Sequence, residues 1–293
     1  MPKVQPGILS TETRLARYLV FSLKPASDPK AALLTLGSDI DGHDTVAGIG
    51  QSLVMALGSQ IEGLRTFPVM TGPGIAVPAT PGALWLWLRG DDRGELLHRT
   101  RQLAHKLAGA FQLQQVIDAF QYRGNRDLSG YEDGTENPEG EAAIEAAVVS
   151  GRGPGLDGSS FVAVQQWVHD LDGFQAMPQA EQDNTIGRRI SDNEEIDEAP
   201  ESAHVKRTAQ ESFEPEAFVL RRSMPWADDQ QAGLVFVAFG HSFDAFEAQM
   251  QRMVGGDDGI VDALFSFTHP VTGSYFWCPP VSEGRLDLSA LGL

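Results

Sequence analysis

The stretch RDLSGYEDGTENP, residues 126–138, gathers carboxylates, glycines and a proline in a very short segment. Asp133 stands at its centre, and Gly130 and Gly134 lie on either side. Glycine adopts backbone angles that other residues avoid, so these positions predict a sharp turn whose backbone can approach a ligand closely. Asp133 is therefore either a residue that stabilises the turn or a carboxylate directed into a pocket. In a pocket it could take up and release a proton.

Two further segments carry side chains suited to chemistry. SAHVKRT, residues 202–208, contains the isolated His204. EAFVLRRSMPW, residues 216–226, reads as an apolar strand that contains the adjacent Arg221 and Arg222. Because neighbouring strand residues point to opposite faces, one arginine is expected to face inward. A buried guanidinium needs an anionic partner, either a carboxylate or a substrate.

Composition and missing motifs exclude several classes of protein. The 293 residues carry a net charge of −18, with a pI of about 4.7, so neither nucleic acid nor an anionic membrane surface is an expected partner. HExxH, GxSxG and GxxxxGK[ST] are all absent from the sequence. Cys278 is the single cysteine, which fits a reducing compartment and is expected to be a small buried hydrophobic residue. With no signal peptide and no apolar stretch of about 20 residues, we expect a cytoplasmic protein.

The first half of the chain reads as alternating strands and helices. A run rich in β-branched and aromatic residues predicts a strand, and apolar residues at helical spacing predict a helix. The expected elements are a strand at 16–23, a helix at 44–61, strands at 63–69 and 83–90, a helix at 94–111 and a strand at 112–122.

The second half repeats the same order. Its expected elements are a strand at 161–170, a helix within 174–189, strands at 216–226 and 233–240, a helix at 242–255 and a strand at 274–280. The chain is thus predicted to be an α+β protein of two ferredoxin-like halves, each β-α-β-β-α-β with an antiparallel sheet. The Gly- and Ala-rich segment 140–160 is the natural boundary, which gives domains at 1–145 and 146–293. A long insert at 184–215 contains His204, and connections of that length are often functional.

Taken together, these segments resemble the dye-decolorizing (DyP-type) heme peroxidases, most closely the bacterial B-type group. The GxxDG motif of that family corresponds to residues 130–134, within the longer pattern FxYxxxRDLxGYxDGTENP from Phe120 to Pro138. The resemblance extends over essentially the whole chain. It implies a fold of the dimeric α/β-barrel-like superfamily, with heme b bound by the C-terminal half.

The resemblance implies a role for residues on both faces of the heme. Asp133 corresponds to the distal carboxylate and Arg221 to the distal arginine, while Gly134 lets the backbone approach the cofactor. Ser223 replaces an asparagine found in many B-type members, and it is expected to belong to the same catalytic group. Because aspartate has a reference pKa of about 3.9, an unperturbed Asp133 predicts an acidic activity optimum.

On the proximal face, His204 corresponds to the axial ligand of the heme iron. Glu216 stands where a carboxylate partner of this histidine is expected, and Asp262 competes for that role. Arg188 resembles a residue that pairs with a heme propionate. His169, His241 and His269 are assigned to the structure of the protein.

The implied function is that of a heme peroxidase. It would reduce hydrogen peroxide through a ferryl intermediate and oxidise dyes and phenolic compounds, with Mn(II) as a further candidate donor. The first alternative is a heme-handling protein that carries heme or releases its iron, and the second is a cofactor-free scaffold. We also expect a homo-oligomer, because exposed sheet edges are usually covered. Some B-type relatives are cargo of encapsulin shells, but the short C-terminal tail here does not favour such targeting.

Overall fold

The computed structural model describes residues 3–10 and 13–293, which form a mixed α+β fold with antiparallel strand pairs. The predicted fold class is confirmed. In the first half, the order β-α-β-β-α-β is interrupted by a short helix and a hairpin. The elements are α1 (Pro6–Leu9), β1 (Leu15–Leu23), α2 (Lys30–Asp39), β2 (Thr45–Ile49), α3 (Gln51–Ala56), β3 (Met70–Gly72), β4 (Ile75–Val77), β5 (Leu84–Gly90), α4 (Arg93–Leu107) and β6 (Phe111–Phe120).

The second half begins after α5 (Gly140–Ala147) and repeats this order with a longer helical insert. Its strands are β7 (Ser160–His169), β8 (Leu220–Arg221), β9 (Met224–Ala227), β10 (Ala232–Gly240), β11 (Thr268–Pro270), β12 (Ser274–Cys278), β13 (Val281–Ser282) and β14 (Arg285–Leu286). Its helices are α6 (Leu171–Ala176), α7 (Gln179–Ile186), α8 (His204–Arg207) and α9 (Asp244–Met253), with 3-10 turns η1 (Gln210–Ser212), η2 (Ala263–Ser266) and η3 (Ser289–Leu291).

The main sheet closes on itself. Its strand order is β11-β7-β12-β2-β5-β1-β6-β9-β10-β8, and an additional pairing of β10 with β7 closes the sheet into a ring. The strands from β7 through β10 in this order therefore form an 8-strand barrel. Each half contributes four consecutive strands, β2-β5-β1-β6 from the first half and β9-β10-β7-β12 from the second. The two halves join where β12 pairs with β2 and where β6 pairs with β9. The predicted division between residues 145 and 146 falls inside α5 and stays a prediction.

The barrel interior is filled by large aromatic side chains. Along β5, Trp85 and Trp87 point to this interior, whereas Leu84, Leu86 and Leu88 point to the outer face, as the two-residue period of a strand requires. Stacked on the two tryptophans are Tyr18, Phe239 and Phe276. The strand is buried on both faces, which explains its continuous apolar sequence.

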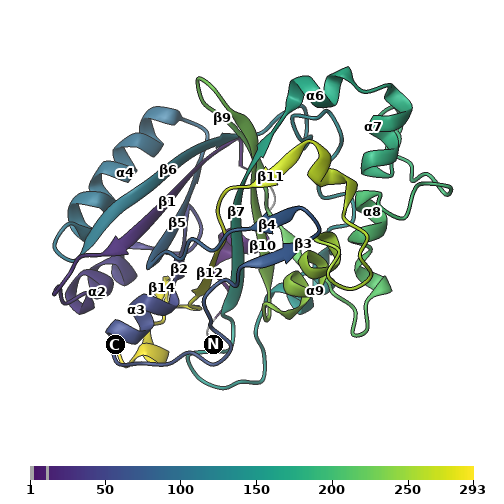
Figure 1. Ribbon diagram of the computed structural model, residues 1–293. Coiled ribbons are helices and arrows are strands. Elements are labelled where there is room, and N and C mark those ends of the chain that lie inside the picture. Colours follow the sequence, from purple (N-terminus) through teal and green to yellow (C-terminus); the bar gives the residue numbers. More distant parts are fainter. Residues whose placement is uncertain (1–2, 11–12) are drawn as a thin grey trace.

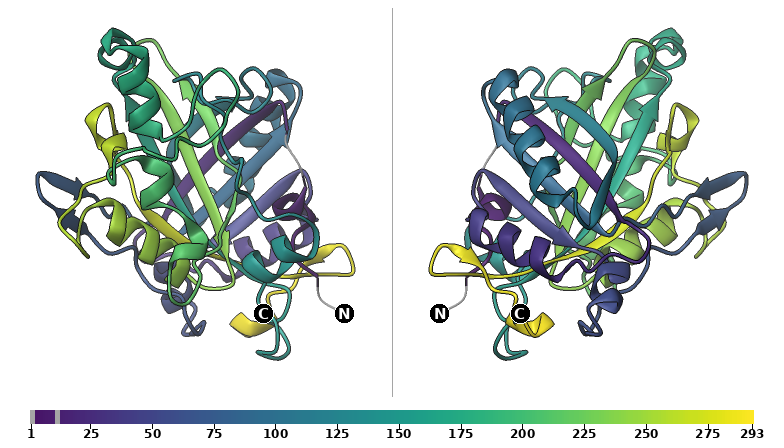
Figure 2. Two further views of the ribbon diagram at one scale, coloured as in Figure 1. Left: turned by 90° about the vertical axis from the view of Figure 1, so that its right-hand side faces the viewer. Right: turned by 90° about the vertical axis from the view of Figure 1, so that its left-hand side faces the viewer.

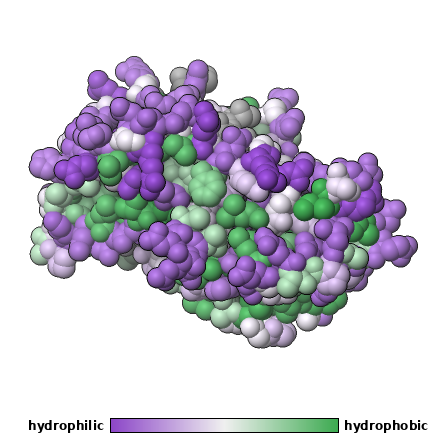
Figure 3. All heavy atoms as spheres, turned by 90° about the horizontal axis from the view of Figure 1, so that it is seen from above, coloured by the Kyte–Doolittle hydropathy of each residue, from purple (hydrophilic) through white to green (hydrophobic). Residues whose placement is uncertain are grey.

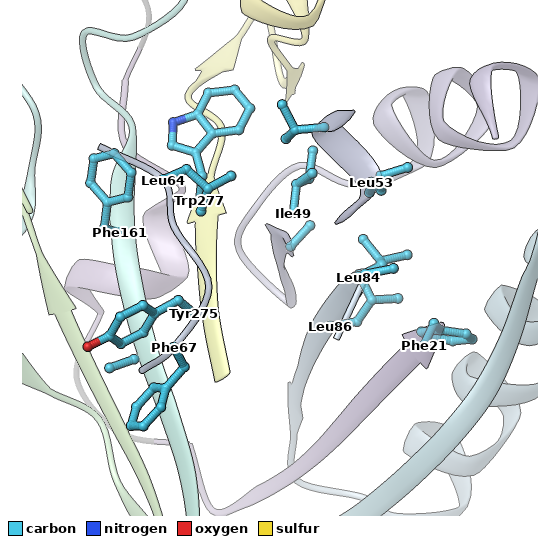
Figure 4. Packing of buried hydrophobic residues seen from close by; sticks show 14 of the residues in the cluster. Phe21, Ile49, Leu53, Leu64, Phe67, Leu84, Leu86, Phe161, Tyr275 and Trp277 are labelled. Atoms are coloured by element: carbon cyan, nitrogen blue, oxygen red, sulfur yellow. The ribbon is translucent and has the colours of Figure 1, made fainter. Parts of the chain in front are cut away.

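Helices cover the outer face of the barrel on two sides. In Figure 1, α2 and α4 lie on one side of the strands and α6 to α9 lie on the other, and the turned views of Figure 2 agree. Of the apolar face predicted for α4, Leu96, Leu103 and Leu107 are buried, whereas Leu97 is exposed. Figure 4 shows part of the outer core, where Trp277, Ile49 and other side chains from the strands pack beneath the helices.

The helix predicted at 44–61 is wrong in its first part. Residues 45–49 form β2, which pairs with β5, and only Gln51–Ala56 is helical. All five residues of β2 are buried, so the strand lacks the polar alternation that distinguishes a strand from a buried helix. Residues 63–69 are not a strand, and the helix that follows β1 is α2, which the pattern did not indicate.

The surface is mixed in character. Seen from above (Figure 3), hydrophobic side chains appear across the middle of this face and along its lower edge, among hydrophilic side chains. Within residues 3–10 and 13–293, no helix combines the length and the hydropathy needed to cross a membrane.

Candidate active site

The turn predicted from residues 126–138 borders a cavity together with α8 and β8. The cavity is open to solvent, and the empty space in it and at its mouth amounts to about 840 Å³. Asp133, His204 and Arg221 all line it, so the structure brings the three predicted segments together. The remaining wall is mainly apolar and includes Trp167, Phe236, Met250, Met253, Leu264 and Phe267.

Asp133 is held by the backbone of its own turn. Its N–H donates to the Asn125 carbonyl at 2.9 Å, and the Asn125 side-chain amide donates to the Asp133 carbonyl at 2.8 Å. Gly130 and Gly134 have positive φ values of +96° and +80°, as the glycine pattern predicted. A Cβ at Gly134 would lie 2.9 Å from the Nδ2 of Asn137, so this position also lacks space for a side chain.

The surroundings of Asp133 perturb its protonation. Burial raises the pKa of its carboxyl above the usual value, and the charge of Asp127 raises it further. Arg221, His204 and the Gly134 backbone N–H act in the opposite direction and lower this pKa. A carboxyl group with a raised pKa on the wall of a cavity is suited to exchange a proton with a bound molecule.

Arg221 is fixed to the same turn through Asn137. The Arg221 N–H donates to Asn137 Oδ1 at 2.8 Å, and Asn137 Nδ2 donates to the Arg221 carbonyl at 3.1 Å. The buried Nε of Arg221 has no hydrogen-bond partner among the described residues, which leaves this donor for a ligand. The neighbouring Arg222 faces elsewhere and donates to the carbonyls of Ile8 and Leu9.

His204 begins α8, and a buried carboxylate orients its ring. Its Nδ1 lies 2.8 Å from Oδ2 of Asp262, whose side chain is fully buried. The other carboxylate oxygen of Asp262 accepts the Leu264 N–H at 2.8 Å, which fixes the carboxylate in turn. Since Nδ1 is occupied by Asp262, Nε2 is the nitrogen that His204 can offer to a ligand.

The expectation that Glu216 partners His204 is corrected. Glu216 is exposed, and Asp262 takes the place of its carboxylate beside the ring. Asp262 is 58 residues from His204 in sequence, whereas Glu216 is only a short distance along the chain. The fold, and not sequence proximity, decides between the two candidates.

Ser223 lies outside the cavity of His204. It lines a second, more polar cavity of about 550 Å³, and its hydroxyl accepts the Val237 N–H at 3.2 Å. Asp133 and Arg221 line both cavities and therefore stand between them. Gly134 also lines the second cavity. The catalytic role of Ser223 stays a prediction. Ser223 shares the wall of the second cavity with Asp133 and Arg221.

Arg188 is buried but does not line either of these cavities. Its guanidinium donates to Glu136 at 2.7 Å, to Glu195 at 2.8 Å and to the Asn193 carbonyl at 2.8 Å. Both carboxylates are more than half exposed. A propionate contact would require Arg188 to exchange one of these partners, and this role stays a prediction.

Sequence reasoning missed two residues on the cavity wall. His169, assigned above to the structure of the protein, lies 3.0 Å from Asp127, and both line the cavity. Tyr131 also lines it, and its hydroxyl donates to Asp183 on α7. These partners lie 42 and 52 residues apart, so no local motif could have identified them. No group of three or more His, Cys, Asp or Glu suited to a metal ion occurs among the described residues.

Comparison with known proteins places the chain in a family. Residues 124–283 match the family model described as "Dyp-type peroxidase, C-terminal", a range that contains Asp133, His204, Arg221 and Asp262. The sequence is 30% identical to a dye-decolorizing peroxidase of Rhodococcus erythropolis, over 95% of this chain and 87% of that protein. It is 29% identical to a dye-decolorizing peroxidase of Mycolicibacterium paratuberculosis, over 96% of this chain and 85% of that protein.

Solved structures of Dyp-type peroxidases are also similar to this chain. A protein of Shewanella oneidensis assigned to the Dyp-type peroxidases superposes with a TM-score of 0.90 and 28% identity, covering 99% of this chain and 98% of that one. A variant of DypB from Rhodococcus jostii RHA1 in complex with heme has a TM-score of 0.83 and 25% identity, covering 93% and 94% of the two chains. A DypB variant in complex with manganese has the same TM-score and identity.

Proposed function

The chain belongs to the Dyp-type peroxidases, which are oxidoreductases, and we propose that it binds heme b beside His204, reduces hydrogen peroxide and oxidises dyes and phenolic compounds. One observation carries this proposal. A histidine backed by a buried aspartate and an aspartate–arginine pair line the same largely apolar cavity. A cofactor-free scaffold has no need of this combination.

The residues of the cavity fit a heme group. Heme iron needs one strong axial ligand and an open position for peroxide. His204 can supply the ligand through Nε2, because Asp262 holds the Nδ1 side of its ring. The apolar wall suits the porphyrin face, and a DypB relative is described in complex with heme. When bound, heme supplies the redox chemistry that the side chains lack.

Asp133 and Arg221 would act on the peroxide. One oxygen of hydrogen peroxide must lose a proton and the other must gain one before the O–O bond breaks. The Asp133 carboxylate can accept the first proton and return it to the departing oxygen. Arg221, with its unpartnered Nε, can stabilise the negative charge that develops there. Asn125 and Asn137 keep these two groups in place.

The reducing substrates are proposed from the chemistry of the family. Dyes and phenolic compounds are one-electron donors, and two such molecules complete one cycle of peroxide reduction. Mn(II) is a further candidate donor, which a DypB variant described in complex with manganese supports.

The proposal is tested by steady-state oxidation of an anthraquinone dye and of guaiacol by the hemin-loaded protein with hydrogen peroxide. We expect Asp133→Asn to lower kcat/KM for peroxide by about 10²–10⁴-fold. Arg221→Leu should lower it by about 10²–10³-fold. If the wild type binds heme but oxidises donors no faster than free hemin, the proposed peroxidase function fails and heme carriage is favoured.

A further inference from the structure

His169 ends β7 beside the proposed heme cavity, and both of its ring nitrogens have partners. Its side chain is only 5% exposed. Nε2 lies 3.0 Å from Oδ1 of Asp127, and Nδ1 lies 2.6 Å from the hydroxyl of Thr268. All three residues line the cavity. The proposed reaction, as described so far, assigns no task to this buried histidine.

The hydrogen bonds of Thr268 indicate how many protons His169 carries. A hydroxyl has one proton to donate, and that of Thr268 lies 3.0 Å from the carbonyl of Val168, which can only accept. If Thr268 donates to this carbonyl, Nδ1 of His169 must donate to the hydroxyl. Nε2 faces the Asp127 carboxylate, which is an acceptor. Both ring nitrogens then carry protons, and the short Nδ1 contact fits a charge-assisted hydrogen bond.

Asp127 connects this histidine to the catalytic turn. Its Oδ2 accepts the Ser129 N–H at 2.8 Å, and its own N–H donates to the Tyr131 carbonyl at 2.9 Å. The Gly130 N–H donates to the Asp127 carbonyl at 2.9 Å. The residue that pairs with His169 therefore fixes the start of the turn that presents Asp133.

Asp127 also acts on Asp133 through its charge. The charged groups that influence Asp133 are Arg221 on β8, His204 on α8 and Asp127 in the same turn. Asp127 raises the pKa of Asp133, and Arg221 and His204 lower it. The charge that faces Asp127 belongs to His169, and its hydrogen bond and charge help to lower the pKa of Asp127 against the effect of burial.

We propose that His169 is a positioning residue: as an imidazolium paired with Asp127, it fixes the turn that carries Asp133 and balances the negative charge beside that carboxyl group. This inference rests on the proposed function, because it concerns the proton-transfer group of that reaction.

The two partners of the pair should affect the reaction with opposite signs. In His169→Gln the charge of Asp127 is no longer balanced, so the pKa of Asp133 rises. The acid limb of the activity profile then moves to higher pH, because Asp133 must be ionised to accept a proton. In Asp127→Asn the negative charge is lost, the pKa of Asp133 falls and the acid limb moves to lower pH. If His169 and Asp127 only maintained the structure, both variants would lose activity, but their acid limbs would not move in opposite directions.

Two measurements test the inference. In the cofactor-free wild type, a long-range ¹H–¹⁵N spectrum with through-bond assignment should show His169 with both nitrogens protonated at neutral pH. A neutral tautomer would overturn the proposal, and this experiment needs no variant to fold. In the hemin-loaded protein, kcat/KM for peroxide is then measured against pH for the wild type, His169→Gln and Asp127→Asn.

Matched controls separate this inference from the proposed function. His43 and Asp44 form a similar pair, 2.7 Å apart, with both side chains more than half exposed, so His43→Gln should leave the profile unchanged. Acid limbs that move in the same direction in the His169 and Asp127 variants, or not at all, contradict the positioning role. If Asp133→Asn retains wild-type activity, the proposed proton-transfer function fails instead, whatever the spectrum shows for His169.

Discussion

Replacement of Asp262 by asparagine should weaken heme binding while preserving the shape of the site. The native carboxylate accepts from His204 Nδ1 and from the Leu264 N–H, both at 2.8 Å. Asparagine has one acceptor and one donor group, so it cannot accept from both. If its oxygen faces Leu264, its NH₂ group faces Nδ1, and the ring proton must move to Nε2, where it blocks a metal ligand. If the amide turns over, its NH₂ group opposes the Leu264 N–H in a buried site.

The expected loss of heme affinity follows from the role of Asp262, which orients His204. Loss of a carboxylate that orients a ligating histidine typically costs about 10–100-fold in affinity, which corresponds to about 1.4–2.8 kcal/mol. The assay is titration of the cofactor-free protein with hemin, followed by the heme absorption band. Glu216→Gln is the control, because it changes the exposed carboxylate that sequence reasoning favoured. The reasoning is refuted if Asp262→Asn binds hemin as tightly as the wild type, or if Glu216→Gln causes the loss.

Three further predictions concern the turn of Asp133. Asn137→Ala removes two hydrogen bonds to Arg221. Urea unfolding should show that the free energy of unfolding falls by about 1–3 kcal/mol, and kcat for peroxide should fall as well. An unchanged kcat would contradict the positioning of Arg221 by Asn137. Gly134→Ala should lower Tm more than Gly124→Ala. Both glycines have a positive φ, but only a Cβ at position 134 would meet Asn137, at 2.9 Å. An equal fall in Tm for the two variants would exclude this contact as a cause. Burial raises the pKa of Asp133, so its contribution to stability is fully present below the carboxyl pKa of the unfolded chain and is lost as pH rises through the higher folded pKa. Unfolding measured against pH should lose this dependence in Asp133→Asn, and an unchanged dependence would argue against a raised pKa.

The raised pKa of Asp133 also modifies the acidic optimum expected from the sequence. That expectation assumed an unperturbed aspartate. Burial and the charge of Asp127 shift the acid limb of peroxide reduction upward from where a solvated aspartate would put it, although Arg221 and His204 oppose the shift. The sequence could identify the carboxyl group, but its pKa depends on residues that only the fold brings near.

Local patterns predicted the elements whose burial is one-sided. Apart from the exposed Leu97, the outward face of α4 is polar and its inward face is apolar, so its period could be read from the sequence. In contrast, β2 is buried on both faces, and its apolar sequence continues into α3, so the two elements read as one helix. The closure of the barrel by β7 and β10 joins strands far apart in sequence and has no local signal.

The residues of the candidate site were also predictable only in part. The glycine-flanked Asp133 and the His204 and Arg221 segments were recognisable, because residue type and order carry a motif. The side chains that pair with the site residues were less predictable. The pairing of His204 with Asp262, and of His169 with Asp127, depends on contacts between distant segments. Arg188 pairs with Glu195, which is seven residues away, and with Glu136, which is 52 residues away. Only the pairing with Glu136 depends on the folded turn and has no signal in the sequence around Arg188.

We propose that His204 holds heme in the cavity that Asp133 and Arg221 also line. The most direct test is the absorption spectrum of hemin-reconstituted wild type beside His204→Ala and His98→Ala, before and after one equivalent of hydrogen peroxide. His98 is an exposed histidine on α4, remote from the cavity, and serves as the control. We predict a heme band that is lost or shifted only in His204→Ala, and a peroxide-dependent change in the other two proteins. A heme spectrum unaltered in His204→Ala would place the axial ligand elsewhere and contradict the account.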